Sequence, residues 1–150
     1  MSVAIITGAS RGLGLALAQP RRRVLVVTGD GEMLMGLGSL ATIGAEQPLN
    51  LGIVVLDNEH YGETGMQVAH TARGVDLAGI AAATGFKLAV TVRTEGEVDS
   101  LAAQLFTVPG PLFAAVKVST SPSPTSLPPR DGPYLRSRFR EALLGPDAHV

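Results

Sequence analysis

Short apolar runs alternate along the chain with segments in which apolar residues recur at helical spacing. The runs are rich in β-branched residues and predict buried strands at 3–7, 24–28, 51–56, 87–92 and 112–118. The segments of helical spacing lie between them, at 13–19, 32–44, 76–84 and 95–106. This alternation predicts an α/β domain with a doubly wound, mostly parallel sheet and helices on both faces.

Three segments fall outside this alternation. Residues 57–72 are polar and contain glycine, which predicts a long loop. Residues 119–133 are rich in serine and proline and predict an extended linker, and 134–144 predict a short basic helix. We therefore expect an α/β domain at 1–118, the linker after it, and a C-terminal helix and tail at 134–150.

The composition excludes several classes of protein. With 45% hydrophobic and 17% charged residues in a length of 150, the chain is typical of one globular domain. A net charge of −1 gives no indication of nucleic-acid binding, and we interpret Arg21-Arg22-Arg23 as a solvated turn. The absence of cysteine excludes disulfides and thiolate metal sites. No signal peptide or spanning segment is visible, so we expect a cytoplasmic protein without membrane contact.

Two polar residues stand at the carboxyl ends of neighbouring predicted strands. Asp30 lies between two glycines after the strand at 24–28, and Asn58 follows the strand at 51–56. Parallel strands bring both side chains to the same edge of a sheet, where ligands bind in such folds. A carboxylate and an amide oxygen are hard ligands that suit Mg²⁺, so the pair predicts a magnesium site.

The glycines beside Asp30 indicate which kind of ligand binds through the metal. Gly31 opens a predicted helix, whose free N–H groups and dipole favour an anion. Gly29 and Gly31 let the backbone approach that anion closely, and Mg²⁺ commonly completes its shell with phosphate oxygens. The pattern predicts a metal-bound diphosphate. The alternative, a strand-to-helix turn that merely contains Asp-Gly, is disfavoured by the correctly spaced Asn58.

The same segments resemble a known family. Gly29-Asp30-Gly31 followed by Asn58 resembles the thiamine diphosphate motif. The stretches "GLGLALAQP", "VLVVTGDGEMLMGLGSLATIGA" and "LGIVVLDNEHYGETGMQ" resemble the diphosphate-binding domain of phosphonopyruvate and sulfopyruvate decarboxylase-type proteins. The resemblance extends over residues 12–144, and it implies a thiamine diphosphate-binding fold.

The resemblance also implies roles for individual residues. The side chains of Asp30 and Asn58 and the backbone carbonyl of His60 would hold Mg²⁺. The residues implied to contact thiamine diphosphate are Gly29, Asp30, Gly31, Glu32, Asn58, Tyr61, Gly62, Glu63, Thr64 and Gly65. The implied reaction is the decarboxylation of a small acidic 2-oxo acid, a carbon–carbon lyase activity that the cofactor supplies.

Some residues near this motif admit two interpretations. His60 and His70 could protonate an intermediate or contact an acidic substrate, or they could be solvated loop histidines. Gln67 is a further candidate for substrate contact. Glu32 could belong to the site, or it could complement the dipole of its helix.

The first eleven residues depart from the resemblance, since they lack the glycines expected just upstream of Gly12. We therefore expect a truncated domain or a foreign start. The stretch "VAIITGASRGLG" resembles the opening of short-chain dehydrogenases, which bind NAD(P). That family needs a Tyr-x-x-x-Lys pair, whereas Tyr61 and Tyr134 are followed at the fourth position by Gly65 and Arg138. The dehydrogenase remains the weaker alternative.

The resemblance further implies a partner. Enzymes of this type activate the cofactor with a glutamate on a separate pyrimidine-binding domain, and nothing in this sequence matches that domain. We expect the isolated chain to be inactive and to work with a pyrimidine-binding subunit or as a homo-oligomer. A non-catalytic, truncated remnant of the domain is the other alternative.

Overall fold

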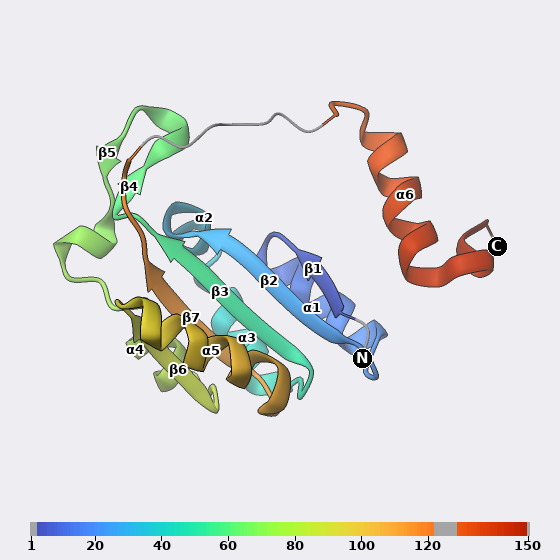
Figure 1. Ribbon diagram of the computed structural model, residues 1–150, viewed down its shortest axis with the longest axis horizontal. Coiled ribbons are helices and arrows are strands. Elements are labelled where there is room, and N and C mark those ends of the chain that lie inside the picture. Colours follow the sequence, from blue (N-terminus) through green and yellow to red (C-terminus); the bar gives the residue numbers. More distant parts are fainter. Residues whose placement is uncertain (1–2, 122–128, 150) are drawn as a thin grey trace. The chain divides into compact units, whose positions relative to one another are not determined.

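The computed structural model describes residues 3–121 and 129–149, and its centre is a five-stranded sheet (Figure 1). The strands lie in the order β1-β2-β3-β7-β6, and all four neighbouring pairs are parallel. They are β1 (Val3–Ile6), β2 (Arg23–Gly29), β3 (Leu51–Asp57), β6 (Leu88–Val92) and β7 (Leu112–Lys117). Five strands lie where apolar runs predict them.

Helices cover both faces of the sheet, which confirms the doubly wound α/β fold. In the view of Figure 1, α5 (Glu95–Thr107) lies in front of the sheet, and α1 (Ala9–Ala18) and α3 (Ser39–Glu46) lie behind it. The core behind the sheet also takes in α4 (Leu77–Ala83). Because side chains alternate between the faces of a strand, β2, β3, β6 and β7 each contribute to both cores.

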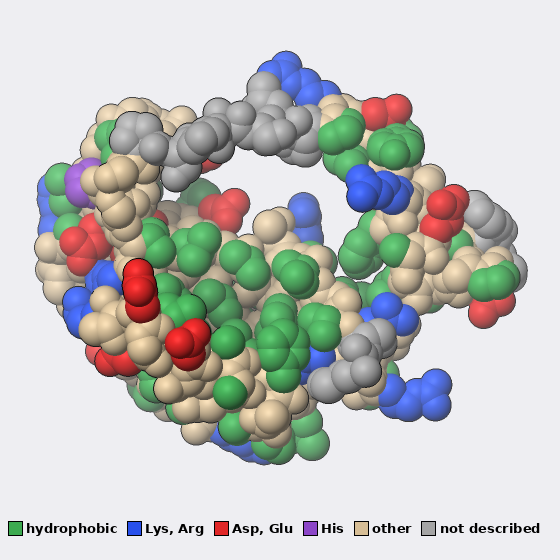
Figure 2. Space-filling view, viewed as in Figure 1, with side chains coloured by type: hydrophobic (Ala, Val, Ile, Leu, Met, Phe, Trp, Pro, Cys, Tyr) green, Lys and Arg blue, Asp and Glu red, His purple; other side chains and the backbone are tan. Residues whose placement is uncertain are grey.

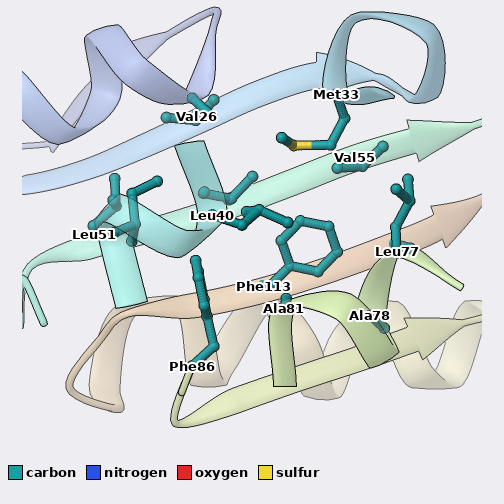
Figure 3. Close-up of a cluster of buried hydrophobic side chains, with 14 of the residues drawn as sticks. Val26, Met33, Leu40, Leu51, Val55, Leu77, Ala78, Ala81, Phe86 and Phe113 are labelled. Carbon is teal, nitrogen blue, oxygen red and sulfur yellow. The ribbon is translucent and has the colours of Figure 1, made fainter. Parts of the chain in front are cut away.

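The larger core lies on the side of α1, α3 and α4 (Figure 3). Phe113 of β7 is fully buried there and meets Phe86 edge-on, with ring centroids 6.0 Å apart. The fully buried large side chains around it are Val24, Val26, Met33, Leu40, Ile43, Leu51, Ile53 and Val55. These are the apolar positions that identify the strands and the second helical segment in the sequence.

The opposite face packs against α5. Leu101 and Leu105 of this helix pack on Leu25, Leu112 and Ala114. The cover is incomplete, because hydrophobic side chains stay visible on the surface beside the helix (Figure 2). On β1, Ile5 pairs in register with Leu25 and is 66% exposed.

Glycines produce the two main departures from the predicted helices. The segment 8–14 is not a turn: α1 begins at Ala9, and Gly12 lies where any Cβ would collide with the side chain of Val26. The predicted helix at 32–44 is two helices, α2 (Asp30–Met35) and α3, separated at Gly36–Gly38. Helical periodicity continues across this break and therefore does not reveal it.

Gly44 on α3 marks a close helix contact that gives a testable prediction. A Cβ at this position would collide with the backbone carbonyl of Thr84, at the end of α4. We expect Gly44→Ala to lower the free energy of unfolding by about 1–2 kcal/mol, because backbone must shift. Gly96→Ala on α5 is the matched control: its Cβ meets nothing within 4 Å, so helix propensity should raise stability slightly. Urea denaturation of both variants checks this, and equal stabilities would contradict it.

The predicted loop at 57–72 contains regular structure. Strands β4 (His60–Tyr61) and β5 (Gln67–Val68) form a short antiparallel hairpin. The 3-10 turn η1 (Gly62–Thr64) lies at its tip and η2 (His70–Arg73) follows it. Strands of two residues are too short for an alternating pattern to identify them.

The interpretation of Arg21-Arg22-Arg23 as a solvated turn is wrong for Arg23. This residue begins β2 and is only 4% exposed. Its Nη1 donates to the carbonyls of Leu49 and Val108, at 3.3 and 3.2 Å. Within the described part of the chain, its Nε and Nη2 find no hydrogen-bond partner. Burial lowers the pKa of Arg23.

The chain divides into two units, Met1–Thr120 and Ser121–Val150. The second contains α6 (Gly132–Leu144), whose first turn is capped by Asp131 through a 2.9 Å bond from the Tyr134 N–H. Of the predicted linker, residues 122–128 lie outside the described residues. None of the helices in the described ranges is both long enough and apolar enough to cross a membrane.

Candidate functional site

The carboxyl ends of β2 and β3 border a cavity of about 520 Å³. The register pairs Gly29 with Leu56, so the residues that follow these two strands emerge at the same edge of the sheet. Both Asp30 and Asn58 line this cavity, as their predicted positions require. The lining residues are Gly29, Asp30, Gly31, Glu32, Met35, Leu56, Asn58, His60, Tyr61, Gly62, Glu63, Thr64 and Val118.

Asp30 is the acidic centre of the site. Its side chain is buried, with the residue 3% exposed, and its Oδ2 accepts a 3.1 Å hydrogen bond from the hydroxyl of Thr71. Burial raises the pKa of Asp30, and the negative charge of Asp57 raises it further. The hydrogen bond from Thr71 lowers the pKa in part. A buried carboxylate beside a second one is stabilised by a cation.

Asn58 and His60 both line this cavity, and each carries an oxygen atom that could bind a cation. The Ala69 N–H donates to the Glu59 carbonyl at 2.8 Å, which makes His60 and Val68 a non-hydrogen-bonded pair of the hairpin. The carbonyl of His60 therefore faces away from β5. Its N–H donates to Asn58 Oδ1 at 3.0 Å, and its Nδ1 lies 3.0 Å from the Asn58 carbonyl oxygen.

These atoms fit a hard divalent cation. Carboxylate, amide and carbonyl oxygens form a donor set suited to Mg²⁺, which takes its remaining ligands from phosphate and water. Within residues 3–121 and 129–149 no cluster of three Asp, Glu, His or Cys side chains could hold a metal. The expected set does not need one, because it combines a single carboxylate with two neutral oxygens.

The glycines around Asp30 have different surroundings. A Cβ on Gly29 would meet nothing within 4 Å, so the chain is open to a ligand there. A Cβ on Gly31 would lie 2.8 Å from Cδ1 of Tyr61, so the aromatic ring itself requires this glycine. The carboxylate of Glu32 accepts from the Thr28 hydroxyl at 2.6 Å and from the Gly29 N–H at 3.3 Å. Glu32 thus closes the strand-to-helix turn while also lining the cavity.

The hairpin covers one side of the cavity. Gly62, Glu63 and Thr64 line it, whereas Gly65 does not and adopts a left-handed conformation with φ of 117°. The Thr64 hydroxyl donates to Gln67 Oε1 at 3.0 Å, and Gln67 Nε2 donates to the Thr64 carbonyl at 2.9 Å. Gln67, a candidate for substrate contact, here stabilises the hairpin tip.

The two candidate histidines lie in different places. His60 lines the cavity and is partly buried. His70 is exposed and is not among the lining residues; its Nδ1 contacts the Tyr61 hydroxyl, and the two rings meet edge-on. The structure thus brings His60 to the site and places His70 behind Tyr61.

Sequence reasoning missed a polar cluster beside this site. Thr71 donates to Asp57 Oδ1 at 2.9 Å, and Lys117 Nζ lies 2.7 Å from Asp57 Oδ2 and 2.5 Å from Glu59 Oε1. Burial would lower the pKa of Lys117, but hydrogen bonds to the two carboxylates outweigh it and hold the pKa above its usual value. Asp57 and Lys117 are the last residues of their strands and pair in register, a signal visible only once β3 and β7 are known to be neighbours.

The family profile described as "Thiamine pyrophosphate enzyme, C-terminal TPP binding domain" matches residues 2–116. The chain belongs to this family. The match begins at residue 2, so it includes the segment that resembles the opening of short-chain dehydrogenases. One family therefore accounts for almost the whole sheet.

Relatives with known names support the same assignment. The chain is 38% identical over 136 residues to sulfopyruvate decarboxylase subunit beta of Methanothermobacter thermautotrophicus, over 91% of this chain and 70% of that protein. It is 39% identical over 112 residues to phosphonopyruvate decarboxylase of Streptomyces viridochromogenes, over 75% of this chain but only 28% of the relative.

A solved structure agrees in fold. The thiamine diphosphate-dependent 4-hydroxybenzoylformate decarboxylase of Rhodococcus jostii RHA1 superposes with a TM-score of 0.62 at 21% identity. The superposition covers 75% of this chain and 23% of that one. This family member thus corresponds to one part of a larger enzyme of the same fold.

Proposed function

We propose that the chain binds thiamine diphosphate through Mg²⁺ and serves as the cofactor-binding subunit of a 2-oxo-acid decarboxylase. The observation that carries this proposal is the convergence of Asp30, Asn58 and His60 on one cavity at the carboxyl edge of β2 and β3. Membership of the thiamine pyrophosphate enzyme family supports the same ligand.

Each part of the cavity has a role in this proposal. The Asp30 carboxylate, the Asn58 side-chain oxygen and the His60 carbonyl hold the cation. Glu63 and Thr64 at the hairpin tip line the same cavity and would contact the diphosphate. When bound, the cofactor supplies the electron sink for the electrons left by CO₂. The apolar side chains of Leu56 and Val118 give the rest of the cavity a less polar wall.

The substrate and the partner follow from the relatives. Proteins named sulfopyruvate and phosphonopyruvate decarboxylase indicate a small acidic 2-oxo acid. Three of the relatives are named as beta subunits, which favours a second, pyrimidine-binding subunit. The apolar sheet face that α5 leaves uncovered gives such a partner a surface to bury.

Calorimetric titration with thiamine diphosphate tests the cofactor proposal. We expect saturable 1:1 binding with Mg²⁺ present and none after chelation with EDTA, because the metal anchors the diphosphate. Thiamine without the diphosphate is the matched control and should not bind. Failure of the cofactor to bind with Mg²⁺ would contradict the cofactor proposal.

The partner requirement gives a separate prediction. With Mg²⁺ and thiamine diphosphate, the isolated chain should release no CO₂ from sulfopyruvate or phosphonopyruvate above the protein-free rate, because no residue is assigned to activate the pyrimidine ring. A coupled CO₂ assay measures this. A parallel preparation of Asp30→Ala shows how much CO₂ release comes from contaminating enzyme. Turnover by the isolated chain that exceeds this background would refute the partner requirement.

A further inference from the structure

A cluster of polar contacts joins Asp30 to Asp57 and Lys117 through the Thr71 hydroxyl. The Thr71 hydroxyl stands between two carboxylates, 3.1 Å from Asp30 Oδ2 and 2.9 Å from Asp57 Oδ1. Asp57 is joined on its other oxygen to Lys117, at 2.7 Å. Asp30 and Asp57 are 3% exposed and Thr71 is 7% exposed, so these bonds are largely shielded from solvent.

Asp57 is firmly held by donors of its own. Its Oδ1 also accepts from the Glu59 N–H at 3.1 Å, and Lys117 is fixed in turn by Glu59 Oε1. Lys117 and Asp57 end two paired strands of the sheet, so this anchor is rigid. Thr71 lies in the short turn η2, and its hydrogen bond to Asp57 ties it to the end of strand β3.

Thr71 occupies one oxygen of Asp30 and so fixes the rotation of that carboxylate. Asp30 lines the cofactor cavity, while Thr71, Asp57 and Lys117 line a separate cavity of about 340 Å³. The bond from Thr71 engages Oδ2 of Asp30, which leaves Oδ1 as the oxygen without a bond to Thr71. Partners that orient a metal ligand in this way commonly set metal affinity.

We propose that Thr71 is a positioning residue for the metal site: its hydroxyl, anchored through Asp57 and Lys117, orients the Asp30 carboxylate toward the cation. This assignment rests on the proposed function, in which Asp30 holds Mg²⁺. Thr71 does not touch the cofactor; it acts through Asp30.

Cation affinity distinguishes positioning from a merely structural hydrogen bond. Mn²⁺ replaces Mg²⁺ as the probe, and electron paramagnetic resonance gives its dissociation constant in the presence of thiamine diphosphate. Thr71→Val should weaken Mn²⁺ binding by about ten-fold or more, the usual range for losing a partner of a metal ligand. Thr71→Ser keeps the hydroxyl and should restore affinity to within about three-fold of the original protein.

The matched control is Thr84→Val, which removes a 2.9 Å hydroxyl bond to the Ala81 carbonyl away from both cavities. It should lower stability without changing Mn²⁺ affinity. If Thr71→Val does not fold, Thr71→Ala replaces it with the same expected loss. Equal affinities of Thr71→Val and the original protein would overturn the positioning role alone. Absence of Mn²⁺ binding by the original protein would overturn the proposed function and the positioning role together.

Discussion

Asp30→Ala is expected to weaken Mg²⁺-dependent binding of thiamine diphosphate by more than about 100-fold. That exceeds the ~10–100-fold cost of losing a residue that only orients a metal ligand. The reason is charge: Asp30 contributes the single carboxylate of the proposed set, and Asn58 and His60 contribute neutral oxygens. Calorimetry at a fixed Mg²⁺ concentration measures the change.

Two controls separate this loss from unfolding. Asp99→Ala removes an exposed carboxylate from α5 and should leave cofactor affinity unchanged. Without metal, Asp30→Ala should be at least as stable as the original protein. The substitution removes one of two buried carboxylates that lie close together around the Thr71 hydroxyl. A folded Asp30→Ala protein that binds the cofactor as tightly as before would remove Asp30 from the metal site.

The positions of Asp30 and Asn58 could be predicted because both follow strands that the sequence marks clearly. Apolar, β-branched runs identify β2 and β3, and the register of parallel strands then brings their ends together. The residue types at those ends carry the chemical information. Nothing more than strand identity and residue chemistry is needed for this part of the cavity.

Thr71 and Lys117 could not be found in the same way. Thr71 lies in η2, where no hydrophobic period identifies a structure or a direction. Lys117 meets Asp57 because β7 lies between β3 and β6, although β6 precedes it in the chain. Strand order depends on long-range packing, which local patterns do not contain. The sequence therefore predicts most residues that line the cavity, but not Met35, Leu56 and Val118, and it does not predict the polar cluster beside the cavity.

Glycine positions show the same limit for the helices. The glycines at 8–14 favour a turn by propensity, yet most of this segment is helix, because Gly12 allows α1 to approach Val26 on β2. At Gly36–Gly38 glycine does break the helix, as propensity predicts. The difference between the two glycine segments is that Gly12 packs against Val26 on β2. Local sequence patterns do not indicate such a long-range contact.

Lys117→Met is expected to have the largest effect on stability outside the core. The substitution keeps the apolar stem but removes the cation that lies 2.7 Å from the buried Asp57 carboxylate. Breaking a buried ion pair from one side costs about 3–5 kcal/mol. Because the Lys117 side chain is 20% exposed and water reaches its partner Glu59, we expect a loss of about 3 kcal/mol in the free energy of unfolding.

A second substitution shows whether the cause is the unpaired charge. Adding Asp57→Asn to Lys117→Met removes the stranded carboxylate, and the double variant should recover most of the lost stability. Lys87→Met, at an exposed lysine, is the control and should change stability by less than about 0.5 kcal/mol. Urea denaturation at neutral pH gives all values. A double variant that is less stable than Lys117→Met would show that Asp57 contributes through its hydrogen bonds to Thr71 and Glu59 rather than through its pairing with Lys117.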